Sequence, residues 1–291
     1  MPTSSLQNSA ISALQIWLNG EVIPADEAAV SPFDHGLLTG DGVFETLIAY
    51  GGKAFAFSRH YERLKHSAQR FGLAVPAKEV LLEAANGLLE TNGMEHARIR
   101  ITITGGTAPL GSEKGEDSEM VIVAVGPLPK HGAEGHVVRV EWPRNEKGAT
   151  AGLKTTSYGE NVIALAHAKK NGGTEAIFGN TSGQLCEGTG SNIFVVRDDQ
   201  LITPPLSSGC LAGVTRAIVL DLCEDFGLSC KETDTPFEEL AEVDEAFLTS
   251  TLREVQPIAT VDGKALKRVP GELTLKLKAA FKELTATTVD P

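Results

Sequence analysis

Cysteine is scarce in this sequence, with four residues in a chain of 291. Four cysteines are too few for the disulfide framework of a small secreted protein, and a chain of this length buries enough apolar surface without one. None of them lies in a Cys-x-x-Cys pair or at a metal-ligand spacing. We therefore expect reduced cysteines that pack in the interior, namely Cys186, Cys210, Cys223 and Cys230.

Basic residues are outnumbered, because 26 Lys and Arg stand against 38 Asp and Glu and give a formal net charge of -12. The longest basic runs are pairs such as Lys169 and Lys170, which are typical of a solvated helix face. A chain with this balance repels nucleic-acid phosphates and anionic lipid. Neither is expected as a partner.

Long apolar runs are missing as well. No stretch approaches the roughly eighteen apolar residues of a membrane-spanning helix. Residues 1–14 lack the basic start and the apolar core of a secretory signal. The sequence therefore predicts a soluble cytoplasmic protein.

The common catalytic and nucleotide-binding motifs are also lacking. There is no G-x-G-x-x-G after a predicted strand, no Walker loop, no H-E-x-x-H and no G-x-S-x-G. The seven histidines are scattered along the chain. Spacing therefore gives no support to a metal site or to a serine or cysteine triad, and no metal is expected.

What is present is an ordinary globular composition with strand and helix patterns mixed. The turn at Asn19 and Gly20 predicts a hairpin that joins Gln15–Leu18 to Glu21–Pro24. In Ala97–Thr104 the isoleucines alternate with Arg and Thr, which predicts a strand with one apolar face and one polar, basic face. A further strand is predicted at 43–50, and helices at 59–70 and 76–92.

The run GPLPKHGAEG, from Gly126 to Gly135, is typical of an interdomain linker. We predict an N-terminal α+β domain at 1–128, a linker at 129–134 and a C-terminal domain at 135–291. In the second half we predict a strand at 137–142 and a helix at 158–171, then strands around Thr181 and a helix that begins near Gly213. Strands and helices do not alternate regularly, so the fold class is α+β rather than a doubly wound sheet.

Three features of the second half point to one kind of chemistry. Lys154 lies between a glycine-rich loop and a helix start, and Glu187 interrupts an otherwise small and apolar stretch. At Gly213, Val214 and Thr215 a helix begins, where free backbone N–H groups favour a phosphate. An amine, an acid and a phosphate-binding helix start are together the groups that a phosphorylated cofactor needs.

Five segments, AGLKTTSYGEN, EGTGSNIF, LITPP, GVTRAIV and FLTSTLREVQPI, occur in this order. Together with WLNGEVIP, GDGVFETL and HYERLKHSA in the first half, they resemble the fold type IV pyridoxal phosphate enzymes, the class IV aminotransferases. The resemblance extends from about Ile16 to Pro257. It implies two domains, a smaller N-terminal α/β domain and a larger C-terminal domain with a pseudo-barrel, and typically a homodimer.

The resemblance also implies roles for individual residues. Lys154 matches the lysine that forms the Schiff base with pyridoxal 5'-phosphate and carries protons between the substrate and the cofactor. Glu187 matches the acid on the pyridine nitrogen, and Arg63 matches a bidentate arginine on the phosphate. Tyr158 matches the tyrosine near the phenolic oxygen. The remaining cofactor contacts that the resemblance implies are Val214, Thr215 and Thr251.

The substrate pocket that the resemblance implies consists of Thr39, Phe44, Thr46, Arg98, Arg100, Leu252 and Arg253. Branched-chain enzymes usually have tyrosine at the position of Thr39, glycine at that of Thr46 and arginine at that of Ile48. D-amino acid enzymes carry an Arg-x-His motif in the loop where this chain has Leu110 and Gly111. Both departures weaken those two interpretations.

Two reactions remain open. An aminotransferase moves an amino group between an amino acid or amine and a keto acid, whereas aminodeoxychorismate lyase makes 4-aminobenzoate and pyruvate. Thr46 is similar to the lyases, but these often have asparagine near the position of Thr251, so we favour the aminotransferase. A third interpretation is a binding module without activity, and the retained Lys154 and Glu187 argue against it. We also expect Arg100 or Arg253 to orient the substrate carboxylate.

Overall fold

The computed structural model describes residues 13–115 and 119–291 and consists of two compact units. The first unit comprises Met1–Pro129, Leu153–Ser157 and Asp290. The second comprises Lys130–Gly152, Tyr158–Val289 and Pro291. Residues 1–12, on which the expected absence of a secretory signal mostly depends, lie outside the described residues.

The division differs from the predicted domains at Leu153–Ser157, at the predicted linker and at Asp290. Leu153–Ser157, which the sequence assigned to the C-terminal domain, belongs to the first unit because it hydrogen-bonds to the edge of its sheet. The predicted linker at 129–134 lies almost entirely within the second unit. There Gln256 Nε2 donates to the Gly132 carbonyl at 2.8 Å, which ties this segment to a strand of the same unit.

The first unit is built on a six-stranded antiparallel sheet in the order β2-β1-β6-β5-β3-β4. The predicted hairpin and the predicted alternating strand are confirmed residue for residue as β1, β2 and β5. The strands are β1 (Gln15–Leu18), β2 (Glu21–Pro24), β3 (Gly42–Tyr50), β4 (Lys53–Ala54), β5 (Ala97–Thr104) and β6 (Met120–Gly126).

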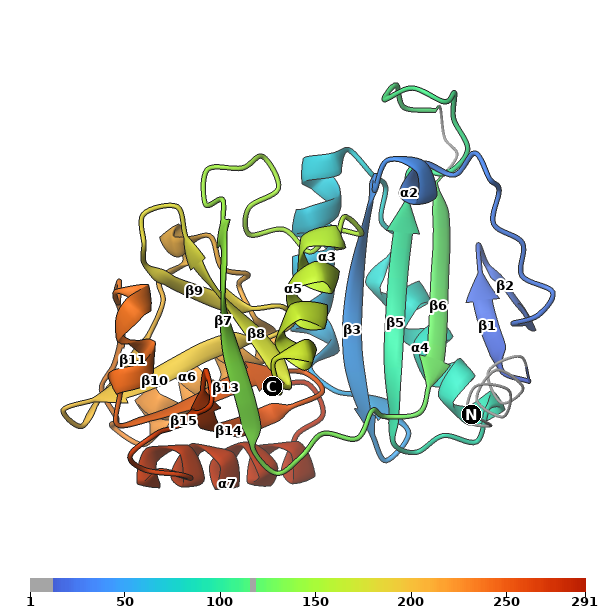
Figure 1. The fold of residues 1–291 in the computed structure, drawn as a ribbon. Coiled ribbons are helices and arrows are strands. Elements are labelled where there is room, and N and C mark those ends of the chain that lie inside the picture. Colours follow the sequence, from blue (N-terminus) through green and yellow to red (C-terminus); the bar gives the residue numbers. More distant parts are fainter. Residues whose placement is uncertain (1–12, 116–118) are drawn as a thin grey trace. The chain divides into compact units, whose positions relative to one another are not determined.

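Two long helices, α3 (Phe57–Phe71) and α4 (Lys78–Thr91), cover one face of this sheet (Figure 1). They confirm the helices predicted at 59–70 and 76–92. A short helix, α2 (His35–Leu38), precedes β3. Alternation along β3 and β5 sends Val43, Leu47 and Ile101 into the core between sheet and helices. The opposite face of both strands therefore carries the even-numbered residues.

The second unit contains a nine-stranded mixed sheet in the order β12-β11-β10-β13-β14-β7-β8-β9, with β15 paired to β14. Three pairs are parallel, β7 with β8, β7 with β14 and β11 with β12. The strands are β7 (Gly135–Arg144), β8 (Glu175–Asn180), β9 (Leu185–Gly188), β10 (Asn192–Arg197), β11 (Gln200–Thr203), β12 (Cys230–Glu232), β13 (Glu245–Ser250), β14 (Glu254–Val261) and β15 (Lys264–Ala265).

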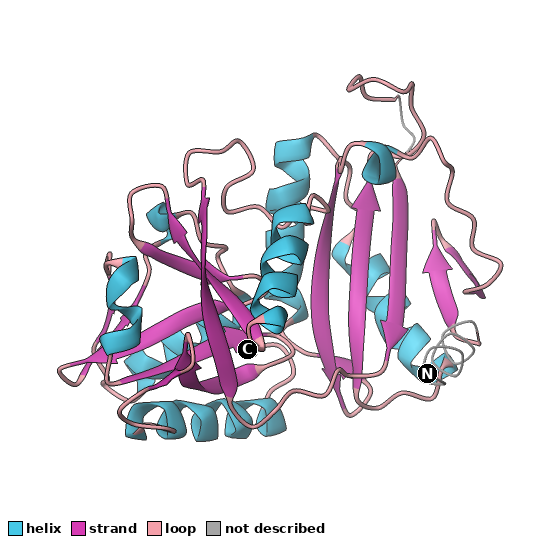
Figure 2. Ribbon diagram, viewed as in Figure 1, coloured by secondary structure: helices cyan, strands magenta, loops and turns pink. Residues whose placement is uncertain are grey.

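This sheet is curled into a half-barrel (Figure 2). β9 lies at one end of the strand order, yet it also contacts β10 near the other end, which requires the sheet to bend. Val137 and Ile177 face the barrel interior, whereas Val138 and Phe178 of the same strands pack against a helix. The helices are α5 (Gly159–Lys170), η1 (Leu206–Ser208), α6 (Val214–Asp225), η2 (Phe237–Glu242) and α7 (Glu272–Thr287).

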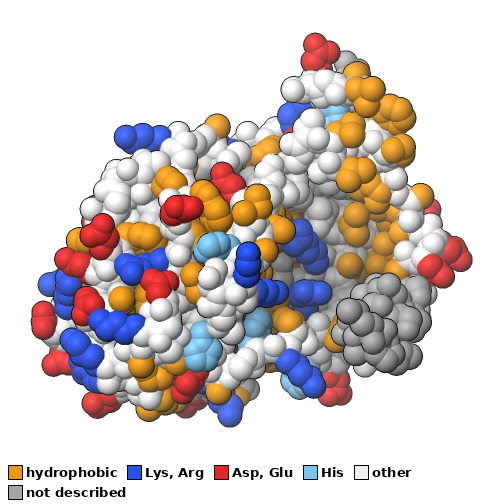
Figure 3. All heavy atoms as spheres, in the orientation of Figure 1, with side chains coloured by type: hydrophobic (Ala, Val, Ile, Leu, Met, Phe, Trp, Pro, Cys, Tyr) orange, Lys and Arg blue, Asp and Glu red, His pale blue; other side chains and the backbone are white. Residues whose placement is uncertain are grey.

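The surface of the second unit carries acidic and basic side chains interspersed (Figure 3). In the first unit, exposed apolar side chains gather around α2, namely Phe33, Leu37, Leu38 and Leu110. Within residues 13–115 and 119–291, no helix is both long and apolar enough to cross a membrane.

Candidate functional site

The structure divides the predicted site residues between the two units. The first unit holds Thr39, Phe44, Thr46, Arg63, Arg98, Arg100 and Lys154. The second unit holds Tyr158, Glu187, Val214, Thr215, Thr251, Leu252 and Arg253. Each set is described within its own unit.

Lys154 is held on the free edge of β3. The Phe44 N–H donates to the Lys154 carbonyl at 3.0 Å, and Thr155 forms an isolated antiparallel bridge with Val43. On the other side, the Lys154 N–H donates to Ser67 Oγ of α3 at 3.2 Å. The backbone of Lys154 is therefore fixed by a strand and a helix at once.

The side chains on the exposed face of the sheet place two cations against one aromatic ring. Lys154 Nζ lies 4.3 Å from the centroid of the Phe44 ring, and Arg100 Cζ lies 3.5 Å from it. Phe44 is itself buried. A ring in this position attracts both cations through its quadrupole and orients their side chains.

Arg98 and Arg100 lie on the same face of β5, as the alternation predicts. In the antiparallel register Arg100 is opposite Thr46, and Arg98 is opposite Ile48. Both arginines are exposed, and Arg100 Nε donates to Thr102 Oγ1 at 3.3 Å. Thr39 is different, because it follows α2 and its hydroxyl donates to the His35 carbonyl at 2.9 Å.

Arg63, on α3, forms a bidentate pair with Glu45 of β3. Its Nε donates to Oε1 at 2.7 Å and its Nη2 donates to Oε2 at 2.8 Å. His60, one turn earlier on α3, places Nδ1 2.6 Å from the same Oε2. The bidentate partner of Arg63 is thus a carboxylate of this chain, and its predicted phosphate contact stays a prediction.

The ionisation of this group follows from its surroundings. Burial by itself raises the pKa of Glu45, but the guanidinium of Arg63 and the ring of His60 outweigh it and hold that pKa well below its usual range. Burial lowers the pKa of His60 against the opposing effect of Glu45, and the charges of Arg63 and Lys154 lower it further. Glu45 is therefore ionised and His60 neutral near pH 7.

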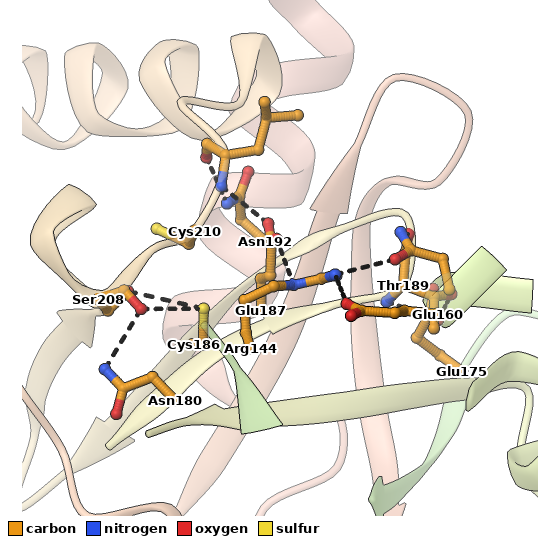
Figure 4. Close-up of polar contacts among 12 residues, drawn as sticks. Arg144, Glu160, Glu175, Asn180, Cys186, Glu187, Thr189, Asn192, Ser208 and Cys210 are labelled. Carbon is orange, nitrogen blue, oxygen red and sulfur yellow. Dashed lines mark hydrogen bonds and ion pairs between the residues drawn. The ribbon is translucent and has the colours of Figure 1, made fainter. Parts of the chain in front are cut away.

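In the second unit, Glu187 lies on β9 with 13% of its side chain exposed. Its Oε2 accepts the Leu211 N–H at 2.9 Å, and its Oε1 lies 3.4 Å from Nε of Arg144. Figure 4 shows Glu187 and Arg144 side by side, with Asn192 close to the Glu187 carboxylate. The predicted acid is thus present, and it is partly accessible.

Arg144 is a residue that the sequence did not single out. Its Nη1 donates to Asn161 Oδ1 at 3.0 Å, and its Cζ lies 4.2 Å from the centroid of the Phe178 ring. Its Nε is buried and makes no hydrogen bond, although Glu187 is near. Arg144 is the last residue of β7, and nothing local in the sequence marks it, because its partners come from α5, β8 and β9.

Tyr158 occupies the position just before α5, one residue into the second unit. Burial raises the pKa of its hydroxyl, and the charge of Glu187 raises it further, against a hydrogen bond with Asn161. The phenol is therefore neutral near pH 7. It can donate a hydrogen bond to an acceptor oxygen without losing its proton.

The start of α6 is shaped for an anion. Gly213 is the N-cap residue, and it supplies no side chain to the first N–H groups of the helix. A Cβ built on Gly213 would lie 1.9 Å from Asn192 Oδ1, so a larger residue there would force Asn192 or the backbone to shift. Val214 and Thr215 are the first two residues of the helix and are buried. The first-turn N–H groups, which no side chain of the N-cap residue caps, and the helix dipole favour a phosphate at this position.

Comparison with known proteins decides the family. Residues 42–261 match the family described as "Amino-transferase class IV". The chain belongs to this family. It is 34% identical to a putative branched-chain-amino-acid aminotransferase of Methanocaldococcus jannaschii, over 93% of this chain and 96% of the relative.

Other relatives of this class IV aminotransferase differ in activity. A D-alanine aminotransferase of Staphylococcus aureus is 31% identical over 92% of this chain and 97% of the relative. An aminodeoxychorismate lyase of Bacillus subtilis is 31% identical over 92% of this chain and 94% of the relative. The crystal structure of the Escherichia coli branched-chain amino acid aminotransferase superimposes with a TM-score of 0.89, at 29% identity and 94% coverage of both chains.

Membership of this family makes the chain a pyridoxal phosphate-dependent aminotransferase of fold type IV, which acts on amino acid and keto acid substrates. The donor set of each unit fits the cofactor. The first unit offers an amine and a guanidinium, and the second offers a carboxylate and a helix start with a glycine cap. In addition, Thr249 Oγ1 on β13 is buried without a hydrogen bond.

The turn after β13 contains three of the predicted site residues, Thr251, Leu252 and Arg253. Thr251 and Leu252 lie in this turn and are half-buried. Arg253 donates to Gln256 Oε1 at 2.6 Å and to the Thr174 carbonyl at 3.1 Å, and it lies 3.4 Å from Glu175 Oε2. Arg253 is therefore tied into a network of its own unit, whereas Arg100 lies on an exposed sheet face.

A second feature absent from the sequence predictions is the buried carboxylate of Glu175. It accepts the Thr189 N–H at 3.1 Å and the Thr189 hydroxyl, and Ser191 Oγ lies 3.4 Å away. Asn161 Nδ2 in turn donates to the Thr189 carbonyl at 2.5 Å. These contacts fix the bend between β9 and β10, which directly follows the strand that carries Glu187. The sequence signal was only that EGTGSN is rich in small residues.

The four cysteines are free, which confirms the prediction that they are reduced. Cys186, Cys210 and Cys223 are buried, and Cys230 is half-buried. Burial raises the pKa of Cys210 to about 11 and raises that of Cys186 further. Both thiols are therefore protonated near pH 7 and are poor nucleophiles. Both lie beside Glu187 (Figure 4).

Proposed function

We propose that Lys154 is the catalytic residue of this aminotransferase and bonds to pyridoxal phosphate through Nζ. The observation that carries this proposal is the backbone of Lys154, which is held by β3 and by Ser67 of α3. A lysine fixed in this way presents its side chain in a defined direction, over the Phe44 ring. The other residues proposed to hold the cofactor are Arg63, Tyr158, Glu187, Val214, Thr215 and Thr251.

Pyridoxal phosphate supplies, when bound, a ring that stabilises the charge left on the substrate Cα after loss of a proton. With the cofactor bound, Lys154 Nζ would be the base that takes up that proton, holds it and returns it. Glu187 keeps a proton on the ring nitrogen through its carboxylate. Tyr158 donates a hydrogen bond to the phenolic oxygen. The neutral phenol of Tyr158 suits the second of these roles.

We propose that the phosphate lies at the start of α6, with Arg63 and Thr251 as further donors. Gly213, Val214 and Thr215 support this, because the N-cap position has no side chain and the first turn is buried. A phosphate bound by backbone N–H groups and a guanidinium keeps its charge. A phosphate held there would anchor the cofactor independently of Lys154.

The substrate carboxylate is proposed to bind Arg100, with Thr39, Thr46 and Arg98 nearby on the same unit. Arg100 is supported by its exposed face and by its contact with Phe44. Arg253, with Leu252, is the alternative. Arg100→Gln should raise KM for the amino acid by about 10- to 100-fold, the cost of losing a hydrogen bond to a charged group. Unchanged kcat/KM in both Arg100→Gln and Arg253→Gln would rule out both assignments.

A lyase acting on aminodeoxychorismate is the second candidate. It is supported by the 31% identity to the Bacillus subtilis lyase and by Thr46 on the sheet face. The two candidates separate on their products, because the lyase needs no amino acceptor. Formation of 4-aminobenzoate from aminodeoxychorismate, without conversion of any amino acid, would reverse the ranking.

We further propose a homodimer in the cytoplasm. The exposed apolar side chains at α2 support a protein interface, because single soluble chains seldom leave such a group in water. Light scattering on the purified enzyme tests this. Replacing Leu37 and Leu38 by serine should shift a dimer toward monomer.

The decisive experiment is borohydride reduction of the enzyme followed by peptide mass analysis. The cofactor mass should be found on Lys154, and Lys154→Ala should lose both this mass and the turnover. Lys147→Ala, in the exposed loop before it, is the control and should keep both. L-amino acids, D-amino acids and (R)-1-phenylethylamine are then added separately while the cofactor absorbance is followed. Label on another lysine would refute the assignment.

A further inference from the structure

We propose that Glu45 is a positioning residue for the cofactor phosphate and that, with His60, it fixes the guanidinium of Arg63 in one orientation. This inference rests on the proposed role of Arg63 at the phosphate. It adds two residues that neither the motifs nor the family match assigns to the cofactor. Both act through Arg63 and need not touch the cofactor themselves.

The geometry of the three side chains restricts the guanidinium. His60 and Arg63 are three residues apart on α3 and so lie on one face of the helix. Glu45 points toward that face from β3, and its two oxygens accept from two different nitrogens of Arg63 at 2.7 and 2.8 Å. A fork of two parallel hydrogen bonds sets both the position and the plane of the guanidinium.

His60 fixes the carboxylate in its turn. Its Nδ1 lies 2.6 Å from Glu45 Oε2, and because a carboxylate only accepts, Nδ1 is assigned the proton. With His60 neutral, one negative and one positive charge remain in this group. The pair is therefore balanced inside the layer between the sheet and α3, and Arg63 keeps the positive charge that attracts a phosphate.

The position of this cluster argues for more than packing. Its neighbours in the same layer are apolar, for example Leu47, Leu64 and Ala68. A buried ion pair is often no more stabilising than apolar side chains of similar volume, so packing alone does not call for one here. Removing rotational freedom from an arginine before a ligand arrives lowers the entropy cost of binding. Apolar side chains in place of Glu45 and His60 would not orient Arg63.

The same two elements also hold Lys154. On β3, Phe44 donates to the Lys154 carbonyl and the next residue, Glu45, pairs with Arg63. On α3, Ser67 accepts from the Lys154 N–H and lies one turn after Arg63. Glu45 therefore couples the helix to the strand at the level where the lysine is anchored. The phosphate-binding and amine-bearing groups of this unit keep a fixed relation to each other.

The test compares two ligands that differ by the phosphate alone. The full-length protein is freed of cofactor, and dissociation constants for pyridoxal phosphate and for pyridoxal are measured by absorbance titration. Glu45→Gln should weaken binding of pyridoxal phosphate by about 10- to 100-fold, the loss seen when the partner of a metal-binding side chain is removed. Binding of pyridoxal should not change, because it has no group for Arg63.

A second variant guards against a general loss of structure. Glu45→Asp keeps the charge balance of the buried group, but its shorter side chain does not reach both nitrogens of Arg63. It should show the same selective loss for pyridoxal phosphate. Glu245→Gln is the matched control, since Glu245 is also a buried carboxylate on a strand, and it should leave both constants unchanged.

Arg63→Gln separates this inference from the proposed function. If Arg63→Gln does not distinguish the two ligands, the assignment of Arg63 to the phosphate is wrong. If Arg63→Gln distinguishes them but Glu45→Gln and Glu45→Asp do not, the positioning role is overturned and the assignment of Arg63 stands. Equal weakening of both ligands in the Glu45 variants would also overturn it.

Discussion

Glu45 and Glu187 are both carboxylates beside an arginine, but the two units hold them differently. Both oxygens of Glu45 are within 2.8 Å of nitrogens of Arg63 and His60, and the residue is fully buried. Glu187 is partly exposed and accepts a backbone N–H, and Nε of its arginine, Arg144, lies at 3.4 Å. The first carboxylate is enclosed by short charge-assisted hydrogen bonds, whereas the second is held more loosely.

The difference indicates which carboxylate does chemistry. A carboxylate saturated by cations has a fixed charge and serves to orient its partners. A carboxylate that is partly accessible and paired at a longer distance is suited to receive a charged group from a ligand. Residue type and neighbour alone do not separate the two cases, since both residues are carboxylates and both lie beside an arginine. The distances to the arginine nitrogens separate them.

The largest expected effect concerns the stability of the first unit. Glu45→Ala leaves Arg63 buried without its counter-charge, and we expect a loss of about 3–5 kcal/mol in the free energy of unfolding. Urea unfolding of the cofactor-free protein measures it, and hydrogen exchange should locate the loss in β3 and α3. Glu187→Ala should cost less, because Arg144 retains Asn161. Equal losses in the two variants would contradict the comparison.

For turnover, we expect the larger effect at Glu187 rather than at Glu45. Glu187→Gln removes the charge that holds the ring proton, and kcat should fall about 100- to 1000-fold, as for other electrostatic groups at a reacting centre. KM and the free energy of unfolding should change little, because the side chain keeps its volume and a carbonyl acceptor for Leu211. Steady-state kinetics with whichever of the tested amino donors converts the cofactor absorbance measures this. A kcat within a few-fold of the wild-type value would remove Glu187 from the proposed site.

A smaller effect is expected at the helix start of the second unit. Gly213→Ala places a Cβ against Asn192 Oδ1, and the forced shift should cost about 1–3 kcal/mol of stability. Binding of pyridoxal phosphate should weaken more than that of pyridoxal. Gly87→Ala is the control, because Gly87 lies within α4 and a Cβ there has open space. That variant should gain stability by about 1 kcal/mol. If Gly213→Ala weakened binding of pyridoxal more than that of pyridoxal phosphate, this would argue against a phosphate at α6.

The smallest effect is a change in pH dependence. The pKa of His60 is lowered in the folded state. Below the usual histidine pKa of about 6.5, the unfolded chain therefore binds more protons than the folded chain. Stability supplied by neutral His60 is therefore present above that value and is lost as the pH falls. His60→Gln should flatten the decline in the free energy of unfolding between pH 6.5 and 5, by at most about 1.4 kcal/mol per pH unit.

Glu245 offers a check on the sign of this prediction. Burial raises its pKa, so its contribution to stability is present below the unfolded value and is lost as the pH rises. Glu245→Gln should therefore alter the profile in the opposite direction from His60→Gln. Urea unfolding at several pH values measures both. Parallel profiles for the two variants would contradict the assigned protonation of His60.

The sequence predicted those parts of the fold in which local pattern decides the structure. The β1–β2 hairpin followed from its Asn-Gly turn, and β5 followed from its strict alternation of isoleucine with polar residues. Helix α7 was not predicted, although it packs on β14. The return of Leu153–Ser157 to the first unit was missed because backbone hydrogen bonds to β3 leave no mark on the side chains of the segment.

The candidate site shows the same limit. Lys154 and Glu187 were found because their residue types are unusual in their surroundings and because the motifs match a family. Arg144 and Glu175 were not found, since each acquires its meaning from partners that are distant in the chain. For Arg63 the motif pointed to the arginine but not to its carboxylate partner. That partner lies eighteen positions away on another element.

The return of Leu153–Ser157 to the first sheet also bears on how the protein is made. Because the free edge of β3 is covered by residues far beyond Pro129, the N-terminal unit is incomplete when its own continuous sequence leaves the ribosome. It must wait until the chain has been synthesised past Ser157, with the first strand of the second unit already made. A fragment cut at Pro129 would expose that strand edge and lack Lys154. The lysine proposed as catalytic thus also marks the point in synthesis at which the first unit can close.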